Sequence, residues 1–161
     1  MCDHCGCRSH PPIAELTAEH EAILALAEPL AAATRRGHAG DDARRDELVA
    51  RLRSHVAKEE TGLYPLLLAE TGRPADAYDE LEAEHRELFE LLAHDVFDHL
   101  ALYASQRHIE EEEEVLFSAA LFHFDGDTWD ELAAAHARVR HPAGVTAVEA
   151  ASHVTRPRRD A

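Results

Sequence analysis

Apolar residues recur at helical spacing in four successive segments of the chain. The first runs from about residue 13 to 36, and the second starts after Asp41 or Asp42, which can cap a helix, and stops at Gly72. We expect the third to begin at Pro74, because proline suits the first turn of a helix. The apolar stripes contain Leu16, Ile23, Leu24 and Ala27; Leu48, Leu52, Val56, Leu63 and Leu66; Leu81, Leu88 and Leu92; and Leu100, Ile109, Val115, Leu116 and Leu121.

This pattern predicts an all-α fold, an up-down-up-down four-helix bundle with a short fifth C-terminal helix. Thr128 and Glu131 make a capping box for the fifth helix. We expect a Cys-rich N-terminal tag at residues 1–12, one folded unit at 13–140 and a C-terminal tail at 141–161. With 161 residues, 45% of them hydrophobic, the chain can bury the core of one domain.

The chain also repeats itself. The segment HVAKEETGLYP, which starts at His55, aligns without a gap with HIEEEEEVLFS, which starts at His108. In the same way EHEAILAL, from Glu19, aligns with EHRELFEL, from Glu84. The order of the repeats predicts two helical hairpins of similar design, related by a pseudo-two-fold axis within one bundle.

Polar residues interrupt the apolar stripes at the repeated positions. Histidine and glutamate four residues apart differ by only about 40° around a helix axis, so each such pair converges on one point. In the run of five glutamates, only Glu112 shares the face of His108. A buried carboxylate costs several kcal/mol unless it is paired or binds a metal. Because the same stripes hold no Lys or Arg, we predict a metal site made by His20, His55, Glu59, His85, His108 and Glu112.

The turn signals place these six residues at one height in the bundle. The sequence midpoint between the first two polar sites falls within the glycine-bounded segment 37–40, and the next midpoint falls at Thr71. The same arithmetic predicts the third turn near Phe97 and Asp98. The ferritin-like alternative needs Glu-x-x-His on two helices, and only Glu82 with His85 is in phase.

The net charge, the lack of long apolar runs and the cysteines limit which partners and which cellular location we expect. The formal net charge of −16 argues against nucleic acid and anionic membranes as partners. No apolar run approaches the roughly 20 residues that cross a bilayer, and the polar N-terminus is no secretory signal, so we expect a cytoplasmic protein. Cys2, Cys5 and Cys7 either bind a soft metal, act as redox thiols or belong to a flexible reactive tag.

The six-residue pattern, with EExxLYP and EExxLF after the two His–Glu pairs, resembles the hemerythrin family in its bacterial HHE cation-binding form. This resemblance implies two irons joined by an oxo or hydroxo group and by two carboxylates. It makes Glu59 and Glu112 the bridges and the four histidines terminal ligands. One position departs from the oxygen carriers, which have a second histidine one turn after the third-helix ligand, where this chain has Phe89.

With these ligands each iron keeps an open position, where O2, peroxide or NO can bind. The first hypothesis is therefore a non-heme di-iron protein that binds or reacts with such molecules, with an unknown electron donor. The alternatives are an iron or oxygen sensor without turnover and a bundle stabilised by zinc. No acid, base or substrate pocket can be read from the stripes, which leaves enzymatic activity open. The remaining histidines are expected at the surface or at helix ends, among them His94, His99, His123 and His136.

Overall fold

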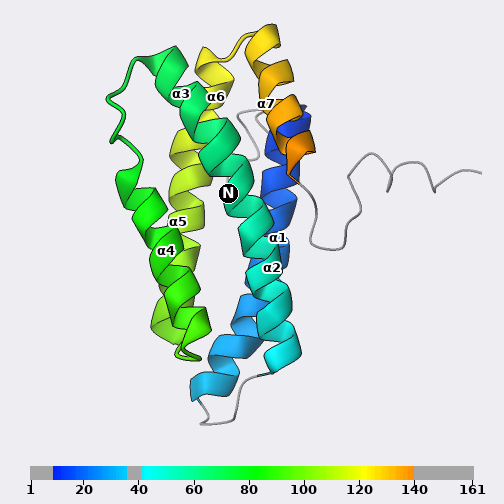
Figure 1. Ribbon diagram of the computed structural model, residues 1–161, viewed down its shortest axis with the longest axis vertical. Helices are drawn as coiled ribbons and strands as arrows, with labels where there is room; N and C mark the ends of the chain where they lie inside the picture. Colours follow the sequence, from blue (N-terminus) through cyan, green and yellow to red (C-terminus); the bar gives the residue numbers. More distant parts are fainter. Residues whose placement is uncertain (1–8, 36–40, 140–161) are drawn as a thin grey trace, which may run out of the picture.

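The computed structural model describes residues 9–35 and 41–139, and every regular element in these ranges is helical (Figure 1). The cysteines of the tag, the segment 36–40 and the tail 141–161 lie outside the described residues. None of the described helices is long and apolar enough to span a membrane. The elements are α1 (Pro11–Arg35), α2 (Asp42–Lys58), the π-helical turn η2 (Glu59–Leu63), α3 (Tyr64–Thr71), α4 (Asp79–Ala93), α5 (His99–Glu111), the π-helical turn η3 (Glu112–Leu116), α6 (Phe117–His123) and α7 (Gly126–Arg138).

The helices pack side by side as a bundle. Helix α1 contacts α2 and α5, and α4 contacts α5 and α2. Figure 1 shows these helices running along the long axis, with α3, α6 and α7 at its upper end. Elements α2, η2 and α3 follow one another without a break, as do α5, η3 and α6, so they correspond to the second and fourth predicted helices.

Two predicted helix starts are wrong. Helix α4 begins at Asp79 rather than at Pro74, because the intervening residues form turns in which the Pro74 carbonyl accepts a hydrogen bond from the Ala77 amide. These turns bring Tyr78 into the core before the helix starts. Helix α7 is capped by Asp125 rather than by Thr128, since the Asp125 carboxylate accepts the Thr128 amide at 2.9 Å.

Other boundaries agree with the sequence. Gly72 ends α3 in the left-handed conformation, with φ of 64°, which favours glycine. The third turn lies where it was expected, because Phe97 is buried there and Asp98 caps α5 through two backbone amides. Helix α1 starts two residues early, at Pro11, and accommodates both prolines in its first turn. A short C-terminal helix is confirmed as α7.

The apolar core consists of two clusters, one at each end of the bundle. The upper cluster in the view of Figure 1 includes Leu16, Leu63, Leu67, Phe117 and Leu132, and the lower one includes Ile23, Leu30, Leu48, Leu92 and Phe97. The polar layer lies between them.

Two residues assigned to the fourth apolar stripe are exposed instead. Val115 is 51% exposed, because the π-helical turn η3 inserts one extra residue and thereby brings Leu116 to the core-facing position. Leu100 is 65% exposed, and the neighbouring Ala101 faces the lower cluster in its place. The apolar pattern therefore located the fourth helix but misjudged its phase at both ends.

Candidate metal centre

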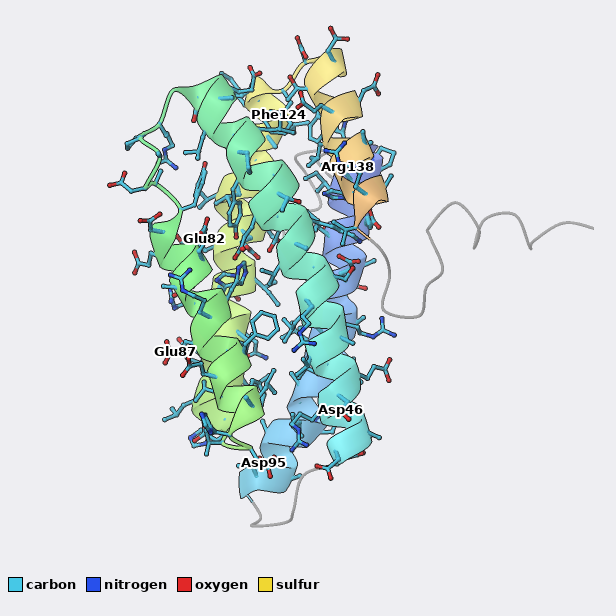
Figure 2. The ribbon with its side chains drawn as sticks, in the orientation of Figure 1. Asp46, Glu82, Glu87, Asp95, Phe124 and Arg138 are labelled. Carbon is cyan, nitrogen blue, oxygen red and sulfur yellow. The ribbon has the colours of Figure 1, made fainter. Side chains whose placement is uncertain are left out.

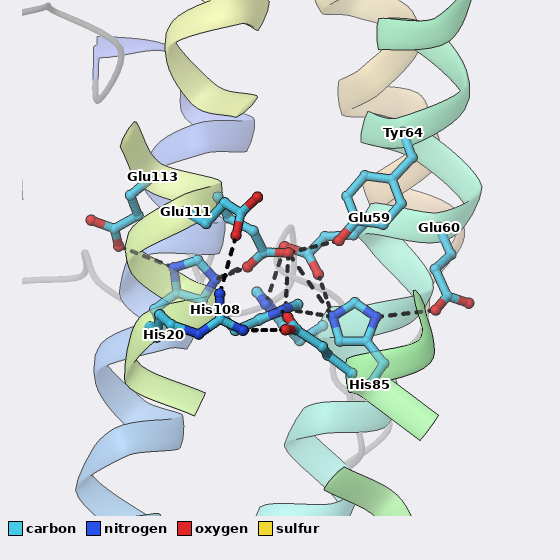
Figure 3. A network of polar contacts seen from close by, with 12 residues as sticks. His20, Glu59, Glu60, Tyr64, His85, His108, Glu111 and Glu113 are labelled. Carbon is cyan, nitrogen blue, oxygen red and sulfur yellow. Dashed lines mark hydrogen bonds and ion pairs between the residues drawn. The ribbon is translucent and has the colours of Figure 1, made fainter. Parts of the chain in front are cut away.

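The structure brings all six predicted residues together between the two apolar clusters (Figure 3). They come from α1, from α2 with η2, from α4 and from α5 with η3. Each glutamate is the first residue of a π-helical turn. All are buried, and Glu59 and Glu112 are 0% exposed. The residues and their elements are His20 on α1, His55 on α2, Glu59 on η2, His85 on α4, His108 on α5 and Glu112 on η3.

Each of the two glutamates faces histidines on both sides. Glu59 places Oε1 3.2 Å from Nε2 of His55 and Oε2 3.5 Å from Nε2 of His85. Glu112 places Oε2 3.2 Å from Nε2 of His20 and Oε1 3.2 Å from Nε2 of His108. Potential ligand atoms accordingly gather in two groups, one around His20, His55, Glu59 and Glu112, the other around His85, His108 and Glu112. Two cations could be held here, with carboxylates between them.

The inner atoms of this cluster lack other partners. Both carboxylate oxygens of Glu59, Oε2 of Glu112 and Nε2 of His20 are buried without a hydrogen bond in the part of the chain that the structure describes. Leaving a buried carboxylate unsatisfied is costly, and a bound cation would remove that cost. Imidazole and carboxylate donors without thiolate suit iron or zinc, so the cluster fits a metal of this kind.

Protons can balance the same charges when no metal is bound. Burial lowers the pKa of His55, but the charge of Glu59 and the hydrogen bond with Glu19 outweigh it and raise the pKa to about 10. Burial also lowers the pKa of His108, but the hydrogen bond with Glu112 and the charge of that carboxylate outweigh it and raise the pKa to about 9. Burial alone would raise the pKa of Glu112, yet contact with the imidazoles of His108 and His20 holds it well below its usual value. Metal binding must therefore displace protons from the histidines.

A second ring of glutamates holds the histidines from outside. Each ring nitrogen Nδ1 contacts a carboxylate on a different helical segment, which leaves Nε2 directed at the centre. The pairs are His20 with Glu113 at 3.0 Å, His55 with Glu19 at 3.2 Å, His85 with Glu60 at 3.1 Å and His108 with Glu84 at 2.7 Å (Figure 3 shows those of Glu113 and Glu60).

Sequence reasoning missed this outer ring, although the repeats contain its signal. Glu19 and Glu84 precede the histidine of each EH dipeptide, and Glu60 and Glu113 follow the inward glutamate of each EE pair. Only Glu112 of the glutamate run was expected to point inward. Glu113 is buried as well, in contact with Nδ1 of His20.

A buried ionic chain connects the centre to α7. The Lys58 ammonium is 3% exposed and binds Glu19 and, at 2.7 Å, Glu15. Glu15 also accepts from His136 at 2.9 Å; His136 lies in the last turn of α7, in agreement with the expected helix end, but it is buried. Lys58, which lies outside the apolar stripes, is therefore a buried cation that sequence reasoning missed. His94, His99 and His123 are exposed as expected.

Aromatic residues after the two His–Glu pairs differ between the halves. Tyr64 stacks on His85 with ring centroids 6.3 Å apart, and the aligned Phe117 stacks on His20 at 5.8 Å. Only the tyrosine adds a hydrogen bond, from its hydroxyl to Oε1 of Glu112 at 2.7 Å. Burial, followed by the charges of the two central glutamates, raises the pKa of Tyr64, so the phenol stays protonated and acts as a donor.

A cavity of about 530 Å³ adjoins the centre and is lined by all four histidines. Most of its wall comes from α4 and α5, with shorter contributions from α1 and α2. Phe89 does not line the cavity and packs against the lower apolar cluster. The groups of potential ligand atoms contain no further residue in the described ranges.

The outer ring yields a prediction that neighbouring glutamates can test. Glu113→Gln should weaken Fe²⁺ or Zn²⁺ binding about 10- to 100-fold, because the amide holds the His20 imidazole less well than a carboxylate does. Glu114→Gln, a change one residue away at an exposed position, should leave the affinity unaltered. Competition titration with a chromophoric chelator measures both. Equal affinities for the two variants would contradict the role given to Glu113.

Comparison with known proteins agrees with this geometry. The family model for the hemerythrin HHE cation binding domain matches residues 11–104, more than half of the chain. The match contains four of the six central residues and stops short of His108 and Glu112, which the structure nevertheless brings to the same site. Searches of curated proteins and of solved structures give no significant match. The chain belongs to the hemerythrin HHE cation-binding domain family.

Proposed function

We propose that the chain is a non-heme di-iron protein that binds or reacts with O2, peroxide or NO. Two iron ions, joined by an oxo or hydroxo group, would be held by one histidine pair each, His20 with His55 and His85 with His108. Glu59 and Glu112 would bridge them. The observation that carries the proposal is the placement of these two carboxylates, whose oxygens face both histidine pairs while three of the four oxygens lack a hydrogen bond among the described residues.

Iron bound here would supply a redox-active centre with positions for small oxidants, and the protein would supply the rest. The outer glutamates orient the four imidazoles, as carboxylates next to metal-bound histidines generally do. Tyr64 holds Glu112 through its hydroxyl. The cavity beside the four histidines offers a path to the centre that small uncharged molecules could follow.

Several features of the chain as a whole remain part of the proposal. The up-down-up-down course of the bundle is supported by contacts of α1 with α2 and of α4 with α5, which are neighbours in sequence. A single folded unit at residues 13–140, between a tag and a tail, is compatible with helices that extend to Arg138. The cytoplasmic location stays a prediction from the sequence.

The metal itself gives the first test of this proposal. Protein purified from cells grown with iron should contain about two irons per chain, in line with the two groups of ligand atoms. Its spectrum should show oxo-to-iron charge-transfer absorption in the near ultraviolet that changes when peroxide or NO is added. Consumption of either reagent would indicate turnover, and a reversible change would indicate binding alone. Stoichiometric zinc with a featureless spectrum would contradict the di-iron proposal.

The glutamate run gives a second, sequence-specific test. Glu59→Ala and Glu112→Ala should each lower the metal content sharply, because both side chains are fully buried and face the histidines. Glu111→Ala and Glu114→Ala should retain the wild-type content, since both residues are exposed. Elemental analysis after identical purification compares the four proteins. The ligand assignment fails if all four hold the same amount of metal.

Removing the metal should destabilise the fold. Without cations the buried glutamates and histidines must take up or share protons, and ligand binding to the native state alone adds stability on the order of several kcal/mol for tight sites. We expect thermal unfolding of the chelated protein at a lower temperature. Deleting residues 1–8, which contain the three cysteines, should change the melting curve little. An unchanged curve after chelation, or a collapse after the deletion, would place the important metal elsewhere.

A further inference from the structure

The cavity beside the centre is larger than the ligands considered so far require. Its volume of about 530 Å³ falls in the range of ~300–1,000 Å³ that is typical of pockets for drug-sized molecules. A diatomic molecule would occupy only a small part of it. We propose that this cavity binds an uncharged, mainly apolar organic molecule next to the metal centre. The proposal rests on the proposed function only for the metal, because the cavity is formed by the fold itself.

Half of the residues that line the cavity are aliphatic, and most of the surface that they expose to it is apolar. The aliphatic residues come from four helices and include Ile23 on α1, Leu52 on α2, Leu88 and Leu91 on α4 and Ala104 on α5. Burying apolar ligand surface against such side chains is favourable by roughly 25 cal/mol per Å². The imidazoles at the inner end are the exception, and their Nδ1 atoms are already bound to glutamates.

Ser105, Asp98 and Glu84, three of the polar residues in the wall, form hydrogen bonds within the protein. The Ser105 hydroxyl donates to the Ala101 carbonyl at 2.9 Å. The Asp98 carboxylate accepts from two backbone amides at the start of α5. Glu84 is bound to His108 and to Arg107. A polar organic ligand would therefore lose its hydrogen bonds to water without regaining them from these groups, which favours an apolar one.

The charge around the cavity selects against anions. Outside the metal centre, Glu84, Glu87 and Asp98 contribute to the wall, and Arg107, which is paired with Glu84 and lies 3.5 Å from Glu111, is the one lysine or arginine among the lining residues. Figure 2 shows Glu87 on the outer side of α4. The whole chain carries a net charge of −16, so a carboxylate or sulfonate would also meet long-range repulsion. An uncharged molecule avoids both costs.

Exposed apolar residues mark the entrance. Val96 and Leu100, at the junction of α4 and α5, line the cavity and are 50% and 65% exposed. Exposed apolar side chains gathered at one place often indicate a binding site. Leu100 was assigned to the core stripe but is exposed. At the entrance of the cavity its side chain would guide an apolar molecule inward.

The uncharged probe N-phenyl-1-naphthylamine tests the proposal by equilibrium dialysis against the metal-loaded protein. We expect saturable binding of one probe per chain. Ala104→Trp should weaken binding at least about tenfold, because the indole would occupy the cavity that Ala104 lines. Since Ala104 is an exposed residue, the fold should tolerate the larger side chain. The matched control is Ala83→Trp, at an exposed position of α4 outside the cavity wall, which should bind as the wild type does.

Two further arms separate the possible outcomes. Phe122→Ala removes the large apolar residue that is most exposed among those the structure describes, at 83%, and should leave binding unchanged unless the probe adsorbs to the surface. Metal analysis of the same samples distinguishes the two proposals. If the protein contains zinc and still binds the probe, only the di-iron proposal is contradicted. Absence of saturable binding to an iron-loaded protein, or equal binding by Ala104→Trp and Ala83→Trp, would overturn the cavity proposal alone.

Discussion

Two buried carboxylates determine the organisation of this protein. Glu59 and Glu112 lie fully buried between two apolar clusters, where a negative charge is tolerated only when positive groups surround it. Imidazoles from four helices meet this need on the inside, and their own outer nitrogens require the second ring of glutamates. The ring in turn requires cations, which Lys58 supplies from the interior and Arg107 from the surface. Each layer of polar residues thus exists because of the one inside it.

The six central residues could be predicted because they obey local rules. Helical spacing put His55 with Glu59 and His108 with Glu112 on common faces, and turn signals put all of them at one height. What helical spacing could not reveal is the π-helical geometry at both glutamates. Tyr64 and Phe117 donate their amides to the carbonyls five residues earlier, so one extra residue enters each helix there. The α-helical period therefore misplaced Val115.

The outer ring escaped prediction for a different reason. Each of its contacts joins different helical segments, and the partners are up to 93 residues apart, as for His20 and Glu113. Spacing along one helix carries no information about such pairs. The wrong starts of α4 and α7 have local causes instead, since Tyr78 and Asp125 form side-chain interactions that compete with the usual preferences of proline and threonine. The sequence pattern therefore located the central layer, but it did not reveal side-chain pairs between helices or the local contacts that set helix starts.

The two halves of the repeat have diverged on opposite sides of the centre. In the first half Gly62 allows α7 to pack closely, since a Cβ there would lie 3.1 Å from the Cβ of Ala135, and the buried Lys58 adds an ionic link to the same helix. The aligned positions in the second half are Val115 and Glu111, which are exposed and which none of the helices in residues 9–35 and 41–139 covers in this way. The cavity also departs from the symmetry, because most of its wall comes from α4 and α5. The repeated residues therefore give the centre two similar His–Glu pairs, while the residues that break the repeat determine on which side α7 packs against it and on which side the cavity lies.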